Sequence, residues 1–152
     1  MEAKEILPFI GEMVFRRTAP NQRGRAHGEY VKVDEEKVKQ VIADTMAANE
    51  NLEGIVVCDA KGKVIFGHTI SGGIKHSDVA NLAVKIAGNS SQLSSGLDKG
   101  GLKEVSVAAD NGYIVILGDV KVVLAGIAGE GARESMGLLR MALKRALMAM
   151  VS

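Results

Sequence analysis

The sequence predicts an α+β fold in which a mainly antiparallel five-stranded sheet packs with helices in the order α-ββ-α-βββ-α, after an N-terminal helical extension. Three observations lead to this prediction. Five β-rich runs are interspersed with three stretches of helical periodicity. Short turns rich in Asp, Asn and Gly join neighbouring β-rich runs, so hairpins dominate. The strict alternation of strand and helix that would indicate a parallel sheet is missing.

Residues 1–33 are predicted to form an extension that precedes a domain at residues 34–152. Ile6, Ile10, Met13 and Val14 fall near helical spacing, which predicts a short amphipathic helix over residues 2–15. A linker without periodicity follows. Its single acidic side chain, Glu29, stands against five basic ones: Arg16, Arg17, Arg23, Arg25 and Lys32. Such basicity suits an acidic partner or phosphates, although a solvated tail gives the same pattern.

The domain is predicted to begin with a helix and a hairpin. Asp34 is placed to cap the helix, whose buried stripe is Val38, Val41, Ile42, Thr45 and Met46. The hairpin lies in LEGIVVCDAKGKVIFGHTI, where Asp59 bonds to the turn backbone and Gly62 supplies a positive φ. The continuous apolar run from Ile55 to Cys58 indicates a central strand that is covered on both faces.

A second helix, from about His76 to Ser94, presents two apolar surfaces. The larger side chains form the expected core stripe: Val79, Leu82, Ile86 and Leu93. Beside it runs a strip of small residues, which would let another helix come close: Ala80, Ala83, Ala87, Ser90, Ser91 and Ser94. We therefore expect the small residues to face a partner, and a glutamate at Ala83 or Ala87 to give monomers.

Three further strands are predicted in LKEVSVAA, GYIVILG and KVVLAGIA, with turns at residues 110–112 and 118–119. The exposed polar groups that begin at Lys103 are typical of an edge strand. A last helix is expected from near Ala132 to Val151, with a core stripe of Leu139, Leu143, Ala146, Leu147 and Met150.

The solvent-facing side of the last helix is a candidate partner surface, composed of Arg133, Arg140, Met141, Lys144 and Met148. Methionine is adaptable and common on surfaces that bind several partners. A second copy of the chain, or the N-terminal helix, would account for exposed methionines equally well.

Composition restricts the class of function. The 152 residues suit one domain, and 47% hydrophobic with 24% charged residues is a globular composition. A net charge of +1 and an aromatic content of 3% offer little to nucleic acid. No apolar run reaches the ~18 residues of a membrane span, and no signal peptide is recognisable. We therefore expect a cytoplasmic protein without membrane insertion.

No catalytic centre, cofactor site or metal site is predicted. Cys58 is the single cysteine and lies in an apolar run, so it is expected to be buried and unpaired. His27, His68 and His76 lack a cysteine or nearby carboxylate that would complete a metal set. The serines lack the context of a nucleophile elbow. The sequence thus predicts a protein that is not an enzyme.

The stretch VVLAGIAGEGARESMGLLR leaves one alternative open. A strand, a glycine-rich segment at Gly126–Gly131 and a helix resemble the build of a phosphate-binding site. The spacing G-x-x-G-x-G is not the dinucleotide fingerprint, however, and residues 132–134 are not the Lys and Ser or Thr of a P-loop. We interpret the glycines as a tight turn. A nucleotide- or anion-binding regulatory domain, using this loop or the basic Arg16–Arg25 linker, is the alternative function.

With the order of elements established, the sequence resembles the roadblock/dynein light-chain family from about Asp34 to the C-terminus. The resemblance lies in three segments: LEGIVVCDAKGKVI, GLKEVSVAADNGYIVI and VKVVLAGIAGEGARESMGLLRMALKRAL. They are similar to the family's first strand and hairpin, its edge hairpin, and its closing strand, glycine-rich turn and helix. The resemblance implies a roadblock/profilin-like fold.

The resemblance also implies a homodimer that forms through the second helix and the third strand, with a sheet continuous across both copies. The residues expected at this interface are Ala80, Ala83, Ala87, Ser90, Ser91, Ser94, Lys103, Val105 and Val107. Dimerisation would remove the liability of an open edge strand. The family further implies a non-enzymatic scaffold or regulator that binds a small Ras-like GTPase or a larger complex.

Overall fold

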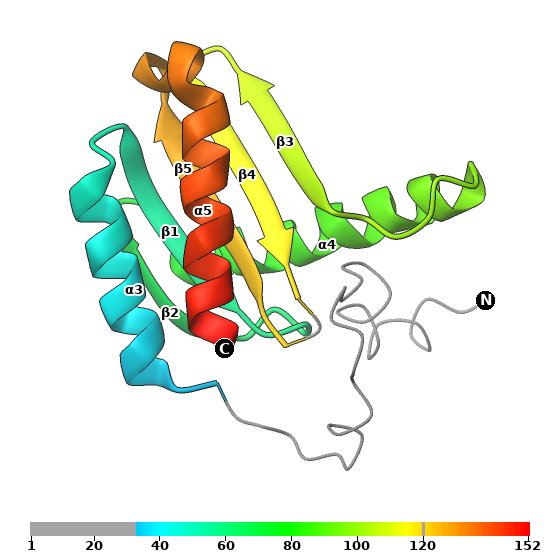
Figure 1. Ribbon diagram of the computed structural model, residues 1–152, viewed down its shortest axis with the longest axis horizontal. Helices are drawn as coiled ribbons and strands as arrows, with labels where there is room; N and C mark the ends of the chain where they lie inside the picture. The colour runs from blue at the N-terminus through cyan, green and yellow to red at the C-terminus, as the bar shows by residue number, and fades with distance from the viewer. Residues whose placement is uncertain (1–32, 120) are drawn as a thin grey trace.

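The computed structural model describes residues 33–119 and 121–152, so the predicted N-terminal helix and basic linker lie outside the described residues. The elements, labelled as in Figure 1, are α3 (Glu35–Ala48), β1 (Leu52–Cys58), β2 (Val64–Thr69), α4 (His76–Gly96), β3 (Glu104–Ala109), β4 (Gly112–Gly118), β5 (Val123–Gly129), a 3₁₀-helix (Glu130–Ser135) and α5 (Met136–Val151). The predicted order of helices and strands is confirmed.

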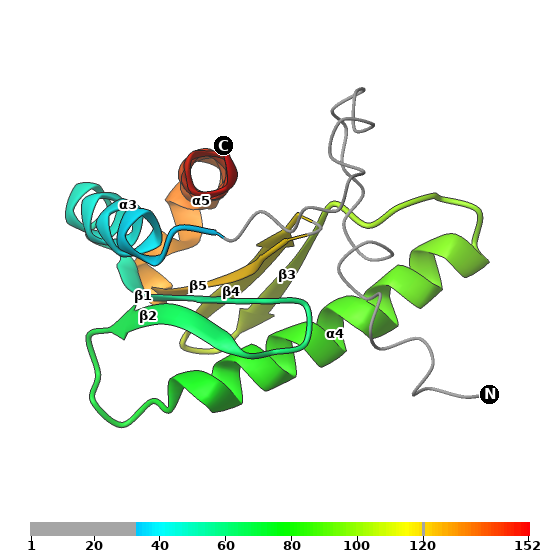
Figure 2. The ribbon, with the colours of Figure 1, turned by 90° about the horizontal axis from the view of Figure 1, so that it is seen from below.

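One antiparallel sheet contains all five strands in the order β2-β1-β5-β4-β3. Strand β1 lies inside the sheet and β3 at an edge, as predicted, and β5 is the middle strand. Figure 2 shows three layers: α3 and α5 cover one face of the sheet, and α4 covers the other. Each face therefore has its own apolar cluster.

The first hairpin forms through the turn chemistry that the sequence predicts. Asp59 Oδ1 accepts hydrogen bonds from the backbone amides of Lys61 and Lys63, both at 2.9 Å. Gly62 has a φ of 90°, which a residue with a Cβ rarely adopts. The turn therefore determines the register of β1 against β2, with a bulge between Val57 and Cys58.

Helix α3 is capped as predicted and is linked to the end of α5. Asp34 Oδ1 accepts a hydrogen bond from the backbone N–H of Glu36 at 3.0 Å. Val38 and Ile42 are buried on the shared core side. Lys37 Nζ donates to the backbone oxygen of Ser152 at 3.0 Å. The start of α3 and the C-terminal end of α5 consequently lie next to each other (Figure 1).

The predicted tight turn at Gly126–Gly131 is wrong, because β5 continues to Gly129. Gly126 pairs with Ile55 on one side and Val115 on the other. A Cβ at Gly126 would lie 2.8 Å from Leu143 Cδ1, so the absent side chain lets α5 pack closely on the sheet. The 3₁₀-helix makes the reversal, and α5 begins at Met136 rather than near Ala132.

Candidate partner-binding surfaces

The side of helix α4 that faces the sheet differs from the prediction. Four of the six α4 residues expected at a partner interface are instead buried within the chain itself, namely Ala80, Ala83, Ala87 and Ser91, while Ser90 and Ser94 are half-buried. Large side chains that were expected in the core are exposed, among them Leu82, Ile86 and Leu93. The predicted core stripe is therefore wrong in these three residues, while Val79 is half-buried.

The opposing sheet face explains this orientation. It already presents larger side chains, including Val56, Ile116 and Val123, which pack against the small residues of α4. Small helix residues allow the helix backbone to approach such a surface closely. With about 3.6 residues per turn, the exposed apolar residues are centred roughly 120° around the helix from the buried ones. We call them the apolar stripe of α4: Leu82, Ile86, Leu93 and Leu97.

The C-terminal end of α4, after Ser91, extends beyond the sheet, and the described part of the chain covers little of it. Figures 1 and 2 both show its C-terminal end past β3. No buried residue of α4 follows Ser91, and Leu93 and Leu97 are 65% and 61% exposed. Ser94 is half-buried, and its Oγ donates to the backbone oxygen of Gly100 at 2.7 Å. Several exposed apolar residues on one side of a helix are typical of an interaction surface.

The open edge of β3 lies on the same side as the projecting end of α4. Within the described residues, β3 pairs only with β4. Of the residues predicted at this edge, Lys103 is exposed, and Val105 and Val107 are half-buried. Val105 packs against the apolar cluster on the α4 side of the sheet. The structure thus places the unpaired edge of β3 on the side where the C-terminal end of α4 projects.

Helix α5 separates its predicted partner surface into two parts. Met141 and Met148 are exposed on the outer face, away from the sheet. Helical spacing places two further exposed residues beside them, Leu138 and Arg145, which the sequence reasoning did not select. Their i, i+3 and i+7 spacing was the signal that would have found them. We call these four residues the outer face of α5.

The other predicted basic residues of this helix lie on its flank, toward β3. Glu104 on β3 interacts with both: Arg140 Nε lies 3.1 Å from Glu104 Oε2, and Lys144 Nζ lies 3.7 Å from Oε1. The contact with Arg140 is short but not aligned as a hydrogen bond, since Arg140 Nε has no hydrogen-bond partner within 33–119 and 121–152. Glu104 Oε1, the oxygen nearer Lys144, has no hydrogen-bond partner among these residues either. The carboxylate of Glu104 therefore partly neutralises the positive charges of Arg140 and Lys144.

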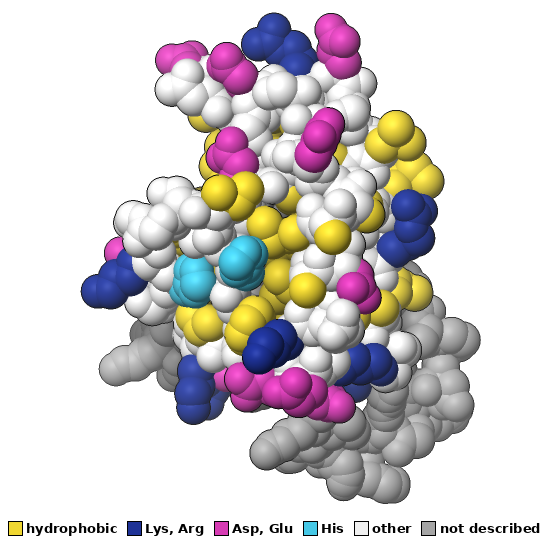
Figure 3. Space-filling view, turned by 90° about the vertical axis from the view of Figure 1, so that its left-hand side faces the viewer, with side chains coloured by type: hydrophobic (Ala, Val, Ile, Leu, Met, Phe, Trp, Pro, Cys, Tyr) yellow, Lys and Arg dark blue, Asp and Glu magenta, His cyan; other side chains and the backbone are white. Residues whose placement is uncertain are grey.

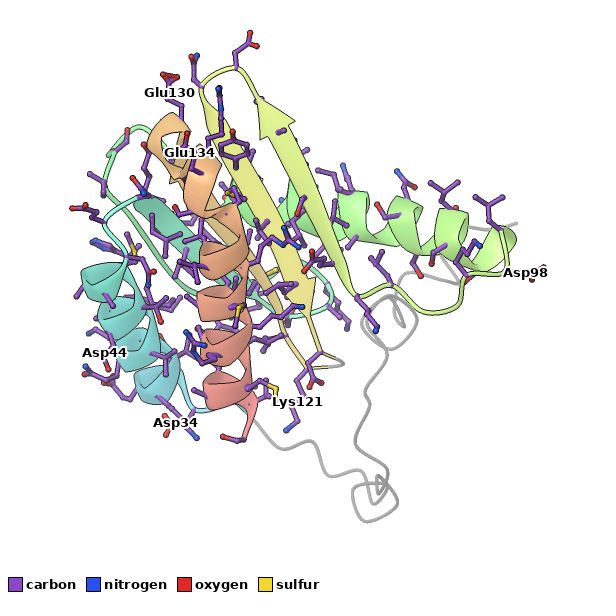
Figure 4. The ribbon with its side chains drawn as sticks, turned by 45° about the horizontal axis from the view of Figure 1, so that its top comes forward. Asp34, Asp44, Asp98, Lys121, Glu130 and Glu134 are labelled. Carbon is purple, nitrogen blue, oxygen red and sulfur yellow. The ribbon has the colours of Figure 1, made fainter. Side chains whose placement is uncertain are left out.

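Arg133 lies on the 3₁₀-helix that precedes α5 and is exposed. Its Nε donates to Tyr113 Oη at 3.4 Å, and this hydrogen bond raises the pKa of Arg133 above its ordinary value. Two acidic residues of the same 3₁₀-helix, Glu130 and Glu134, are labelled in Figure 4. Carboxylates at this end of α5 oppose the binding of a phosphate there.

The geometry also argues against the glycine-loop alternative. Gly126 and Gly129 belong to the paired strand β5, so the segment does not form the free loop that would wrap a phosphate. Gly131 is exposed and lies near the side chain of Asn51. The other part of that alternative, the linker Arg16–Arg25, lies outside the described residues and remains a prediction.

The histidines of the described ranges are His68, on β2, and His76, at the start of α4. Figure 3 shows histidine side chains on one face of the molecule; of the described histidines, His68 is exposed and His76 is half-buried. His76 Nε2 lies 3.2 Å from Thr69 Oγ1. Among the described residues, no group of three or more His, Cys, Asp or Glu side chains is arranged to hold a metal ion. No described helix is long and apolar enough to span a membrane.

Cys58 is buried on the α4 side of the sheet, as the sequence predicts. Desolvation, with a smaller contribution from the charge of Asp59, raises the pKa of its thiol to about 12. A thiol with this pKa stays protonated at neutral pH and is a poor nucleophile. Cys58 therefore contributes to packing.

Comparison with known proteins identifies the fold. The structure is similar to MglB of Myxococcus xanthus, with a TM-score of 0.69 and 17% identity, over 80% of this chain and 90% of that one. It is similar to the gliding protein MglB of Thermus thermophilus, with a TM-score of 0.67 and 19% identity, over 81% and 95% of the two chains. A Roadblock/LC7 domain from Streptomyces avermitilis matches with a TM-score of 0.52 and 20% identity, over 72% and 96%.

The sequence itself gives no such match. No protein-family model matches the chain, and the comparison with curated proteins finds none either. The likeness is therefore carried by the arrangement of the helices and strands. The resemblance inferred from the three sequence segments is confirmed at this level: the chain has the Roadblock/LC7 fold, in a form similar to that of MglB.

Proposed function

We propose that the protein is a cytoplasmic, non-enzymatic homodimeric scaffold or regulator that binds a small Ras-like GTPase or a larger complex. The observation that carries the proposal is the apolar stripe of α4 beside the unpaired edge of β3. Two copies related by a two-fold axis would bury stripe against stripe and pair β3 with β3. A single dimer arrangement would thus cover the apolar stripe of α4 and pair the open edge of β3.

The interface proposed from the structure differs from the sequence prediction on α4. Leu82, Ile86, Leu93 and Leu97 replace the buried Ala80, Ala83, Ala87 and Ser91, while Lys103, Val105 and Val107 are retained on the strand edge. Fully burying one leucine contributes about 1.5–3 kcal/mol, so the stripe is large enough to matter in a dimer. One MglB structure is described as having a tetrameric arrangement, which supports self-association in this fold.

The partner surface is proposed on α5, because its exposed side lies across the sheet from α4. Met141 and Met148, with Leu138, provide an adaptable apolar surface. Arg133, Arg140 and Lys144 provide positive charge at its border, which would steer an acidic partner.

Three measurements test the proposal. Sedimentation equilibrium of the full chain should show a dimer, and Leu93→Glu should show a folded monomer. Immobilised wild-type protein should capture a small GTPase from extract, and Met148→Glu should not. Calorimetry with the purified GTPase should then show affinity that depends on its bound nucleotide.

A monomeric wild-type protein would contradict the dimer. Micromolar binding of GTP or ATP by the chain alone would contradict the scaffold and favour a nucleotide-binding domain. Binding of the GTPase with equal affinity in both nucleotide states would restrict the function to tethering.

A further inference from the structure

We propose that the chain's own N-terminal segment, residues 2–15, binds the outer face of α5. That face exposes Leu138, Met141 and Met148, of which Leu138 and Met148 are 70% and 67% exposed. It is a different surface from the apolar stripe of α4, because α4 and α5 lie on opposite faces of the sheet (Figure 2). A dimer formed through α4 would therefore leave it uncovered.

The chemistry of the segment matches that of the face. Residues 2–15 contain three acidic side chains and one basic side chain: Glu2, Glu5, Glu12 and Lys4. Helix α5 contains the opposite charges and no acidic residue: Arg140, Lys144 and Arg145. Arg140 and Lys144 share Glu104, whereas Arg145 makes no ion pair within the described part of the chain. Arg145 is therefore the charge on the outer face that is available to an acidic segment.

The apolar residues are complementary as well. Ile6, Ile10, Met13 and Val14 fall near helical spacing, so they can form one apolar side. A helix as short as residues 2–15 is marginal in water by itself, and Pro8 restricts it further. An apolar surface would stabilise such a helix, and the outer face of α5 offers one that no described residue covers.

The connection between segment and face is long enough. The described chain starts at Val33, beside the C-terminal end of α5, where Lys37 Nζ contacts the backbone oxygen of Ser152 at 3.0 Å. Residues 16–32 span up to about 3.3 Å each when extended, or roughly 56 Å in all. Helix α5 has 16 residues and a length of about 24 Å. The linker can therefore deliver the segment to any part of the outer face.

The docking itself is independent of the proposed function, but its consequence rests on it. If the outer face of α5 binds a GTPase, the segment occupies the same surface and competes with that partner. The apparent affinity is then reduced by the fraction of molecules in which the face is open. The N-terminal extension would act as an autoinhibitory element.

Hydrogen exchange of the full chain, followed by mass spectrometry, tests the docking. Amides of residues 9–15 should exchange about ten-fold or more slowly than in an unstructured peptide. Met148→Glu and Leu138→Glu should each remove this protection. Ile70→Glu is the matched control, because Ile70 is exposed to a similar degree but lies in the loop after β2; it should leave the protection unchanged.

Three results would overturn the docking: exchange at the unstructured rate in the wild type, protection that survives both α5 substitutions, or protection that disappears on dilution. The last would show that a second copy supplies the segment. The regulatory consequence has a separate readout, Ile10→Glu. This substitution should release the segment and raise GTPase affinity about as many fold as the wild type showed protection. Release without a gain in affinity would contradict the proposed partner surface and leave the docking intact.

Discussion

Two substitutions on α4 test the orientation of this helix directly. Ala87→Glu should impair folding, whereas Leu93→Glu should leave the chain folded and impair dimerisation. Ala87 is 0% exposed beneath the sheet, whereas Leu93 is 65% exposed. If the small residues faced a partner, as the sequence suggested, Ala87→Glu would give a folded monomer. In the observed orientation it buries a carboxylate inside each chain.

The magnitudes follow from burial. An unpaired buried charge costs several kcal/mol, a large part of the about 5–15 kcal/mol by which domains are stable. Ala87→Glu should therefore abolish or severely weaken folding. About two thirds of Leu93 is exposed, and burying it in a dimer should contribute about 1–2 kcal/mol per copy to association. Counted twice in a symmetric dimer, its loss should weaken association by roughly 30- to 1,000-fold.

The assay combines urea denaturation, followed by far-ultraviolet circular dichroism, with sedimentation equilibrium. Leu93→Glu should unfold in a cooperative transition that no longer depends on protein concentration, because mass action from the partner is gone. Ala87→Glu should lose most of its cooperative transition. An Ala87→Glu protein that is monomeric yet has the stability of Leu93→Glu would refute the observed orientation of α4.

The remaining predictions concern stability, each measured by urea denaturation against the wild type. Gly126→Ala should cost about 1–3 kcal/mol, because its Cβ would lie 2.8 Å from Leu143 Cδ1; Gly72→Ala, with no atom within 4 Å, should be neutral. Asp34→Ala should cost about 1 kcal/mol through loss of the helix cap. The pKa of Cys58 is raised to about 12, so the thiol stays protonated in the folded state, whereas it ionises above about pH 9 in the unfolded chain. Between about pH 9 and 12 the free energy of unfolding of the wild type should therefore fall by up to ~1.4 kcal/mol per pH unit relative to that of Cys58→Ala. An equal pH response in both proteins would contradict this burial.

Local chemistry explains why much of the fold was predictable. The Asp59–Gly62 turn is specified by residues next to each other in sequence, since a side-chain acceptor and a positive φ are both needed there. The cap at Asp34 is equally local. The buried stripe of α5 was found because its apolar residues are large and its opposite side contains Arg and Lys.

Helix α4 was mispredicted because its orientation is not a local property. Both of its sides are apolar, one with leucine and isoleucine and the other with alanine and serine. Hydrophobicity alone assigns the larger residues to the core, but the volume of Val56, Ile116 and Val123 decides the packing, and these residues are far away in sequence. Gly126 was misread for a related reason. Its neighbour Leu143 comes from another element, so the sequence offers only the glycine's turn propensity.

The buried alanines of α4 and its exposed leucines are two parts of one solution. A helix that presented its leucines to the sheet would have to stand farther from it, and its small residues would offer little apolar area to a partner. With the small residues inward, the helix lies close to the sheet and its largest side chains remain exposed. In the proposed dimer, self-association is thereby assigned to one face of the sheet. The other face is covered by α3 and α5, and the exposed side of α5 contains Met141, Arg145 and Met148. On that side the proposed partner, or the chain's own N-terminal segment, can bind without disturbing the proposed dimer.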